Sequence, residues 1–94
     1  MLSSFRANLR SKAQTLDPVV MVGHDGISSG VISALDEALT CHELVKVRFQ
    51  DFKDQVKPLA GELASATDSE LVATTGFTAV YYRKKEVLPK KILR

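Results

Sequence analysis

A short strand, a tight loop and a helix follow one another early in the chain, and this succession constrains the fold more than any other feature. The run Pro18–Val22 is unbroken and apolar, which predicts a strand buried on both faces and therefore central in its sheet. Apolar residues then recur at helical spacing over Ser28–Cys41, with Ser28 or Ser29 as the N-cap. The run Leu44–Gln50 alternates and predicts a second strand. A strand–helix–strand unit of this length favours parallel pairing with a right-handed crossover.

Two further helices are expected on either side of this unit. Apolar residues three and four positions apart predict a helix over Leu2–Thr15, and Pro18 ends it because proline disfavours the helical conformation of the preceding residue. A third helix begins no earlier than about Asp54, the candidate N-cap, because Pro58 is tolerated only in a first turn. Its expected buried stripe comprises Val56, Leu59, Ala60, Leu63 and Ala64.

The end of the chain adds a predicted β-hairpin. Two β-rich runs, Glu70–Thr75 and Thr78–Arg83, flank Gly76 at the position of a turn. The expected element order is therefore αβαβαββ. The chain has 94 residues, the length of one domain, so the sequence predicts a single α/β domain.

The charge distribution is uneven although the formal net charge is only +2. Residues 1–12 carry three basic and no acidic side chains, and residues 83–94 carry six basic and one acidic, whereas the middle of the chain is acidic. Basic ends on an acidic middle favour a polyanionic partner that binds one face of the domain. The alternative is that the basic ends serve only solubility.

The sequence also sets an expected environment. It contains no apolar run long enough to cross a membrane, and residues 1–6 lack the apolar segment of a signal peptide. The chain has one cysteine, Cys41, which cannot form an internal disulfide. These features predict a cytoplasmic protein without a membrane partner.

The loop Gly23-His24-Asp25-Gly26 is the first candidate binding element. Two glycines three positions apart allow a tight turn and a close approach to a ligand, and the helix that follows presents free N–H groups to an anion. The alternative is an ordinary tight turn between a strand and a helix. A P-loop lysine and a third glycine are both lacking, so the usual mononucleotide and dinucleotide sites are not expected.

Other candidates lie on the predicted strands. Lys46 and Arg48 project from one face of the second strand and could meet a nucleic-acid backbone together, although a solvated strand face is the alternative. Phe77, Tyr81 and Tyr82 could stack on bases. Because neighbouring strand residues face opposite sides, one of the two tyrosines is expected to pack in the core.

Metal binding and catalysis are not expected. Cys41 and His42 are adjacent, and His24 is the only other histidine, so a set of three or four metal ligands is not apparent. Cys41 is interpreted as a small buried apolar group and His42 as a cap at a helix C-terminus. Neither histidine belongs to a recognisable nucleophile–base arrangement, so no enzyme activity, cofactor or small-molecule substrate is predicted.

Several segments together resemble the CRM domain, the chloroplast RNA splicing and ribosome maturation domain. They are P-V-V-M-V-G-H-D-G-I-S, L-D-E-A-L, C-H-E-L-V-K-V-R and V-Y-Y-R, and the resemblance covers about residues 2–85. It implies a compact fold with a four-stranded mixed sheet, similar to the C-terminal domain of bacterial translation initiation factor 3. It also implies RNA binding, and for a stand-alone bacterial chain of the YhbY type, association with pre-ribosomal large subunits. Residues 1–85 would form the domain and residues 86–94 a basic tail.

The resemblance also assigns candidate RNA-binding residues. The family's glycine loop falls on Gly23, His24, Asp25 and Gly26, and its closing tyrosine–arginine pair on Tyr82 and Arg83. The full predicted set is Arg6, Arg10, Lys12, Gly23, His24, Asp25, Gly26, Ser28, Lys46, Arg48, Arg83, Lys84 and Lys85. Two departures stand out: the loop contains an acid, Asp25, and the segment 66–70 lacks the glycine that often ends the third helix.

The leading hypothesis is therefore an RNA-binding assembly factor of the large ribosomal subunit that contacts ribosomal RNA. The alternative is a protein-interaction module whose charged ends dock an acidic partner. A nucleic-acid absorbance signature in protein purified at low salt would distinguish the two.

Overall fold

The computed structural model of the chain describes residues 2–84, and over this range it has the predicted αβαβαββ order. A short 3-10 turn, η1, is inserted before the third helix. The predicted basic tail, residues 86–94, lies outside the described residues. The elements are α1 Ser3–Ala13, β1 Val20–Val22, α2 Ser29–Cys41, β2 Leu44–Phe49, η1 Lys53–Gln55, α3 Val56–Thr67, β3 Glu70–Thr75 and β4 Thr78–Tyr82.

The four strands form one mixed sheet in the order β1-β2-β4-β3. β1 pairs with β2 in parallel, with Val20 opposite Val47, as the strand–helix–strand unit predicts. β4 pairs antiparallel with both β2 and β3. The pairing of β3 and β4 contains a bulge at Val72, between the registers of Leu71 and Ala73.

The prediction that β1 is a central strand is wrong, because β1 is at the edge of the sheet. Val20 and Val22 are buried, whereas Val19 and Met21 are 61% and 44% exposed. α2 covers one face of β1, but α1 packs on β2, β3 and β4 and leaves the other face of β1 open. An apolar run in the sequence predicts a strand, but it does not show whether a helix covers both faces of that strand.

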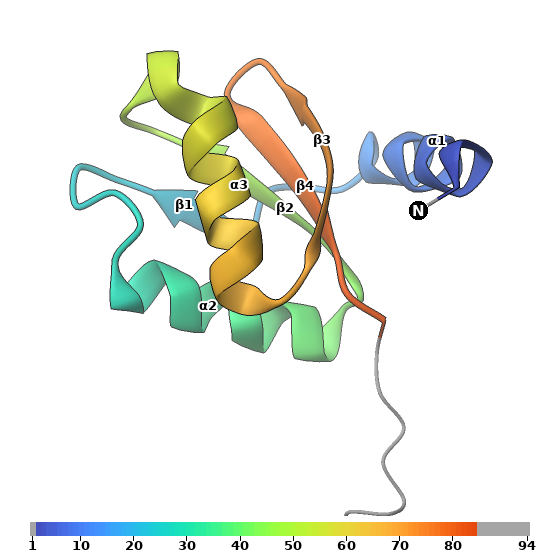
Figure 1. Ribbon diagram of the computed structural model, residues 1–94, viewed down its shortest axis with the longest axis horizontal. Helices are drawn as coiled ribbons and strands as arrows, with labels where there is room; N and C mark the ends of the chain where they lie inside the picture. The colour runs from blue at the N-terminus through green and yellow to red at the C-terminus, as the bar shows by residue number, and fades with distance from the viewer. Residues whose placement is uncertain (1, 85–94) are drawn as a thin grey trace, which may run out of the picture.

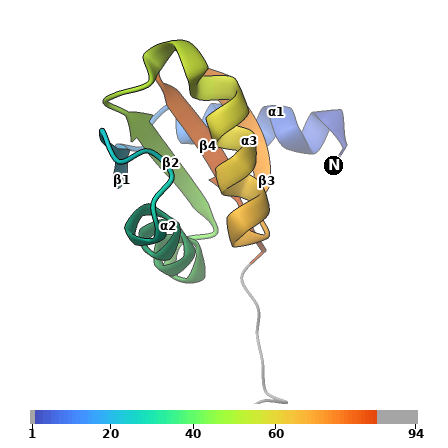
Figure 2. The ribbon, with the colours of Figure 1, turned by 60° about the vertical axis from the view of Figure 1, so that its left-hand side comes forward.

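Helices lie on both faces of the sheet, in three layers. Figure 2 shows α2 and α3 in front of the sheet and α1 behind it. The main core lies beneath α2 and α3 and includes Leu35, Phe49, Leu63 and Tyr81. A smaller cluster of Leu9, Ala13, Val72 and Val80 joins α1 to the opposite face. Burial of both faces accounts for the inward stripes of all three helices.

Only the second half of the predicted stripe on α1 is buried. Leu9 and Ala13 are buried, but Leu2 and Phe5 are 76% and 42% exposed. α1 extends past the β3 side of the sheet in Figure 1, so the strands cover its first turn only in part. Phe5 still makes an edge-to-face contact with Tyr82, with ring centroids 5.4 Å apart.

The start of α3 differs in one detail from the prediction. Pro58 lies in the first turn of α3, as expected, but Asp54 belongs to η1 and does not cap the helix. The N-cap is Gln55, which makes no side-chain capping bond. The 3-10 turn replaces a side-chain cap, after Phe52 turns the chain with a left-handed φ of 55°.

The two tyrosines face opposite sides, which confirms that one of them is a core residue. Tyr81 is fully buried, and its hydroxyl donates a hydrogen bond to the Ala60 carbonyl at 2.9 Å. Tyr82 is partly buried against α1. The prediction of a buried Cys41 is wrong: its thiol is exposed. Cys41 follows buried Leu39 by two positions, which turns it about 200° away from the inward face of α2.

Candidate nucleic-acid interface

The glycine loop forms a tight turn between β1 and α2. The Gly26 N–H donates to the Gly23 carbonyl at 3.0 Å, and Gly26 has a φ of 67°. A Cβ on Gly26 would make an ordinary contact of 3.5 Å with the ring of Phe52, so the positive φ, and not lack of space, favours glycine there. Around Gly23, by contrast, a Cβ would meet nothing within 4 Å. The open side of the turn is therefore at Gly23.

The N-terminus of α2 opens beside this turn. Ser28 is the N-cap, as predicted, and its hydroxyl accepts the Val31 N–H at 3.3 Å. No acidic residue lies in the first turn of α2. At the tip of the loop, exposed His24 and Asp25 form a loose pair, with Nε2 and Oδ1 3.4 Å apart.

Two predicted binding residues instead hold α1 on the sheet. The Lys46 ammonium donates to the carbonyls of Ala13 and Leu16, at 3.1 and 3.2 Å. The Arg6 guanidinium donates to the carbonyls of Leu71 and Val72, at 3.0 and 2.9 Å, where the β3 bulge leaves acceptors free. These cations are engaged within the fold, whereas the interpretation that Lys46 and Arg48 meet a nucleic-acid backbone together stays a prediction.

Three other predicted cations are exposed on the face of the sheet that α1 covers. Arg48 lies two positions from Lys46 on the same face of β2, with Met21 and Thr78 opposite it on the neighbouring strands. Arg10 and Lys12 lie in the last turn of α1. Within residues 2–84, none of these three cations makes a side-chain hydrogen bond or ion pair. We call Arg10, Lys12 and Arg48 the free cations.

Two more predicted residues, Arg83 and Lys84, lie at the opposite end of the sheet from the glycine turn. Arg83 follows β4 and donates to both Asp36 and the Thr67 carbonyl at 2.7 Å. It also reaches Thr40 on α2, so it joins β4 to α2 and α3. Lys84 is exposed beside it, and Lys85 lies outside the described residues. The predicted set is therefore divided between two ends of the domain.

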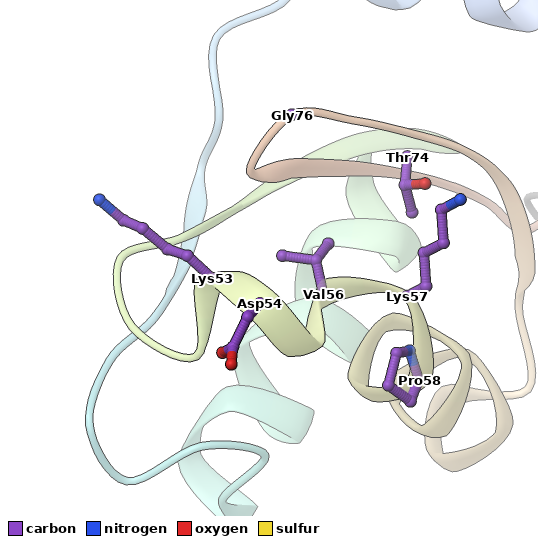
Figure 3. Close-up of a pocket in the computed structure, with 7 residues that line it drawn as sticks. All are labelled: Lys53, Asp54, Val56, Lys57, Pro58, Thr74 and Gly76. Atoms are coloured by element: carbon purple, nitrogen blue, oxygen red, sulfur yellow. The ribbon is translucent and has the colours of Figure 1, made fainter.

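A basic and aromatic feature that the predicted set omitted lies near the glycine turn. The Lys53 ammonium sits 4.8 Å from the centroid of the Phe77 ring. Lys53 and Lys57 also line a pocket of about 560 Å³ between α3 and the β3–β4 hairpin (Figure 3). The sequence analysis names Phe77 as a residue that could stack on bases, but no pattern in residues 53–57 indicates that Lys53 meets its ring.

The described part of the chain contains no group of three histidine, cysteine or acidic side chains placed to hold a metal ion. Within the same part, every helix is too short or too polar to span a bilayer.

The fold and the glycine turn can be compared with known proteins. The model of the CRS1/YhbY (CRM) domain matches residues 1–83. The chain belongs to this family. This CRM-domain protein is 37% identical over 79 residues to a Bacillus subtilis protein named "Probable RNA-binding protein YqeI". The alignment covers 83% of this chain and 82% of the relative. A Haemophilus influenzae protein named "RNA-binding protein" is 35% identical over 88 residues, covering 88% and 89% of the two chains.

A solved structure has the same CRM fold. The solution structure of a hypothetical protein from Staphylococcus aureus, described there as a candidate RNA-binding protein, superposes with a TM-score of 0.79. It is 38% identical in sequence and covers 93% of each chain. The compact α/β domain with three helices and a four-stranded mixed sheet is therefore the fold of the family, and the resemblance seen in the sequence is confirmed.

Proposed function

We propose that this protein binds RNA through the side of the sheet that carries α1 and the neighbouring glycine turn. The observation that carries the proposal is the set of free cations Arg10, Lys12 and Arg48, which no other group in residues 2–84 neutralises. They belong to a CRM domain whose relatives are named as RNA-binding proteins. Cations of this kind release counterions from a nucleic-acid backbone and supply most of the affinity.

The glycine turn contributes shape more than charge. Gly23 leaves open space at the end of β1, so a sugar–phosphate backbone can approach the main chain there. Exposed Asp25 at the tip of the turn repels phosphate, so the backbone passes beside Gly23 rather than over the tip. The phosphates then lie towards Arg48, which is opposite Met21 on β1.

At a finer level, we propose that the RNA is ribosomal and that the protein acts in the cytoplasm on immature large ribosomal subunits. This part rests on the sequence resemblance to the stand-alone CRM proteins. A particle of folded RNA suits a small basic domain with few groups that read bases, because phosphate contacts recognise shape and not sequence.

The test is sedimentation of the tagged protein with ribosomal particles from its own cells, at low magnesium and low salt. We expect the protein to migrate with immature large subunits and to leave them when salt is added. Arg10→Gln with Arg48→Gln should release most of it. Ser33→Glu with Ala34→Glu, which changes the net charge equally on the exposed face of α2, should release none.

Two outcomes would contradict the proposal. Migration of the native protein only at the top of the gradient would exclude the ribosomal particle, and a filter-binding assay on extracted RNA would then test RNA binding by itself. Equal release by the two double variants would show that net charge, and not the α1 side of the sheet, holds the protein on the particle.

A further inference from the structure

Three loops meet at the end of the sheet where the glycine turn lies. The Gln50 N–H donates to the Val22 carbonyl at 2.9 Å, which holds the segment after β2 beside the end of β1. The Phe49 N–H donates to the Phe77 carbonyl at 2.7 Å, which holds the β3–β4 turn beside the same segment. A ligand bound at the glycine turn can therefore continue onto η1 and the hairpin.

Packing makes this surface continuous. The ring of Phe52 lies against Gly26, and the next residue is Lys53, whose ammonium lies over the ring of Phe77. Phe77 nevertheless keeps 46% of its surface exposed. Large aromatic side chains stabilise a fold most when they are buried, so the exposed part of the Phe77 ring contributes little to stability. A ring exposed at a loop tip beside a cation offers a surface on which a ligand can stack. Every nucleobase has a face that can stack on such a ring.

Polar groups line the pocket between α3 and the hairpin, which includes Gly76, the residue before Phe77, and Lys53, whose ammonium lies over the Phe77 ring. Figure 3 shows the Lys57 side chain extending towards Thr74, on the same side of α3 as the hairpin glycine Gly76. Asp54 also lines the pocket, but its carboxylate points away from Lys57 in the same view. A pocket of about 560 Å³ is large enough for a nucleotide-sized group.

We propose that Phe77 and this pocket together receive one unpaired nucleotide of the bound RNA. The base stacks on the exposed part of the Phe77 ring, on which Lys53 already lies, and the neighbouring phosphate lies against Lys57 beside Thr74. Thr74 offers a hydroxyl to the sugar or the phosphate. The inference rests on the proposed RNA binding and adds to it a preference for unpaired RNA, because a base inside a duplex cannot reach a ring at a hairpin tip.

The test compares a labelled single-stranded oligouridine of roughly twelve nucleotides with a blunt RNA duplex that carries a similar number of phosphates. We expect Phe77→Ala to weaken binding of the single strand about tenfold, from the loss of one stacked base, and to change duplex binding less than about twofold. Lys57→Gln should also weaken single-strand binding. Leu2→Ala, which removes another exposed apolar side chain far from this site, should change neither affinity.

A second variant reports stacking directly. The chain contains no tryptophan, so Phe77→Trp introduces a single one at the proposed site. We expect it to retain single-strand affinity and its emission to be quenched by the single strand but not by the duplex. Retained binding also shows that changes at the hairpin tip leave the domain folded.

The outcomes separate this inference from RNA binding in general. If Phe77→Ala leaves single-strand affinity unchanged while Arg48→Gln lowers it, the nucleotide site is wrong and RNA binding stands. If Phe77→Ala weakens single strand and duplex equally, the ring does not select an unpaired base and the inference fails. If the native protein binds neither RNA at low salt, the proposed function fails and the nucleotide site fails with it.

Discussion

Tyr81 combines complete burial in the main core with a hydrogen bond from the sheet to α3. It is among the largest side chains that are fully buried, and its hydroxyl reaches the Ala60 carbonyl on α3 at 2.9 Å. That bond ties α3 to the middle of the sheet. Desolvation by burial raises the pKa of the Tyr81 phenol well above its usual value.

This raised pKa predicts a dependence of stability on alkaline pH. The folded state keeps the Tyr81 proton, whereas the unfolded chain loses it above about pH 10, so the stabilisation is complete below that pH and declines above it. The expected slope of the unfolding free energy is up to about 1.4 kcal/mol per pH unit. Tyr81→Phe should remove this slope and cost about 1 kcal/mol at neutral pH through the lost hydrogen bond.

Urea denaturation at a series of pH values measures the effect of Tyr81. Tyr82→Phe is the matched control, because Tyr82 is the next residue of the same strand and is only partly buried. It should leave the alkaline slope of the native protein in place. An unchanged slope in Tyr81→Phe would show that another group is responsible.

Single residues also show where sequence patterns reach their limit. Arg6 and Arg10 lie one turn apart on α1 with the same chemistry, yet Arg6 bonds main-chain carbonyls 65 and 66 positions away and Arg10 bonds nothing in residues 2–84. Main-chain acceptors carry no sequence signature. The composition could therefore predict a basic helix but not which of its cations remains available.

Asp68 is a residue whose context the sequence did reveal. The CRM resemblance favours a glycine after the third helix, and the segment 66–70 has none. In the structure Asp68 follows α3 with a φ of 53°, the left-handed conformation that glycine adopts most easily. Aspartate tolerates this conformation better than most residues, so the helix still ends there.

At the scale of the elements, α1 depends on polar contacts more than the other helices do. Its cluster with the sheet contains only Leu9, Ala13, Val72 and Val80 as buried members, and its first turn is exposed. Lys46 adds hydrogen bonds to the carbonyls at the C-terminal end of α1, where a positive charge also suits the helix dipole.

We therefore predict that Lys46→Met and Arg48→Met, both on β2, affect different properties: the first lowers stability and the second lowers RNA affinity. Lys46→Met keeps most of the aliphatic stem but removes two hydrogen bonds, so it should lower the unfolding free energy by about 1–2 kcal/mol. Arg48→Met, on the same face of the same strand, should change it by less than about 0.5 kcal/mol. Arg48→Met should instead weaken RNA binding.

Chemical denaturation and an RNA-binding titration on both variants distinguish these roles. The pair is well matched, because the two positions are two residues apart on β2 and each loses one positive charge. Equal losses of stability would mean that the contact of Lys46 with α1 contributes nothing. Loss of RNA affinity only in Lys46→Met would mean that Lys46, and not Arg48, contacts the RNA.

The order and type of the elements were predictable, but their positions in the sheet were only partly so. Hydrophobic spacing fixed α2, β2 and the buried stripe of α3 because these elements pack against a core on a regular face. The edge position of β1 depends on where α1 packs, and the start of α3 depends on the turn at Phe52. Both are tertiary effects that local spacing does not contain.

For the whole molecule, the position of each cation relative to the two ends of the sheet decides what the protein can bind. The glycine turn, η1 and Phe77 share one end, whereas Arg83 and Lys84 lie at the other. Arg83 is also bound to Asp36, Thr40 and Thr67. The sequence could not show this division, because the strand order that separates the residues is a property of the assembled sheet.

This arrangement predicts how RNA affinity depends on salt. Each phosphate that a free cation neutralises adds about 0.7 to the negative slope of log affinity against log salt for a single strand. The free cations with Lys53 and Lys57 amount to five charges, so we expect a slope of about −2 to −4, measured by fluorescence anisotropy on the same oligouridine.

Two arginine variants on α1 test this slope residue by residue. Arg10→Gln should make the slope about 0.7 less steep. Arg6→Gln, one turn away on α1, should leave the slope unchanged and lower stability, because its charge already serves the carbonyls of Leu71 and Val72. Equal slopes in the two variants would mean that RNA does not distinguish a free cation from one engaged within the fold.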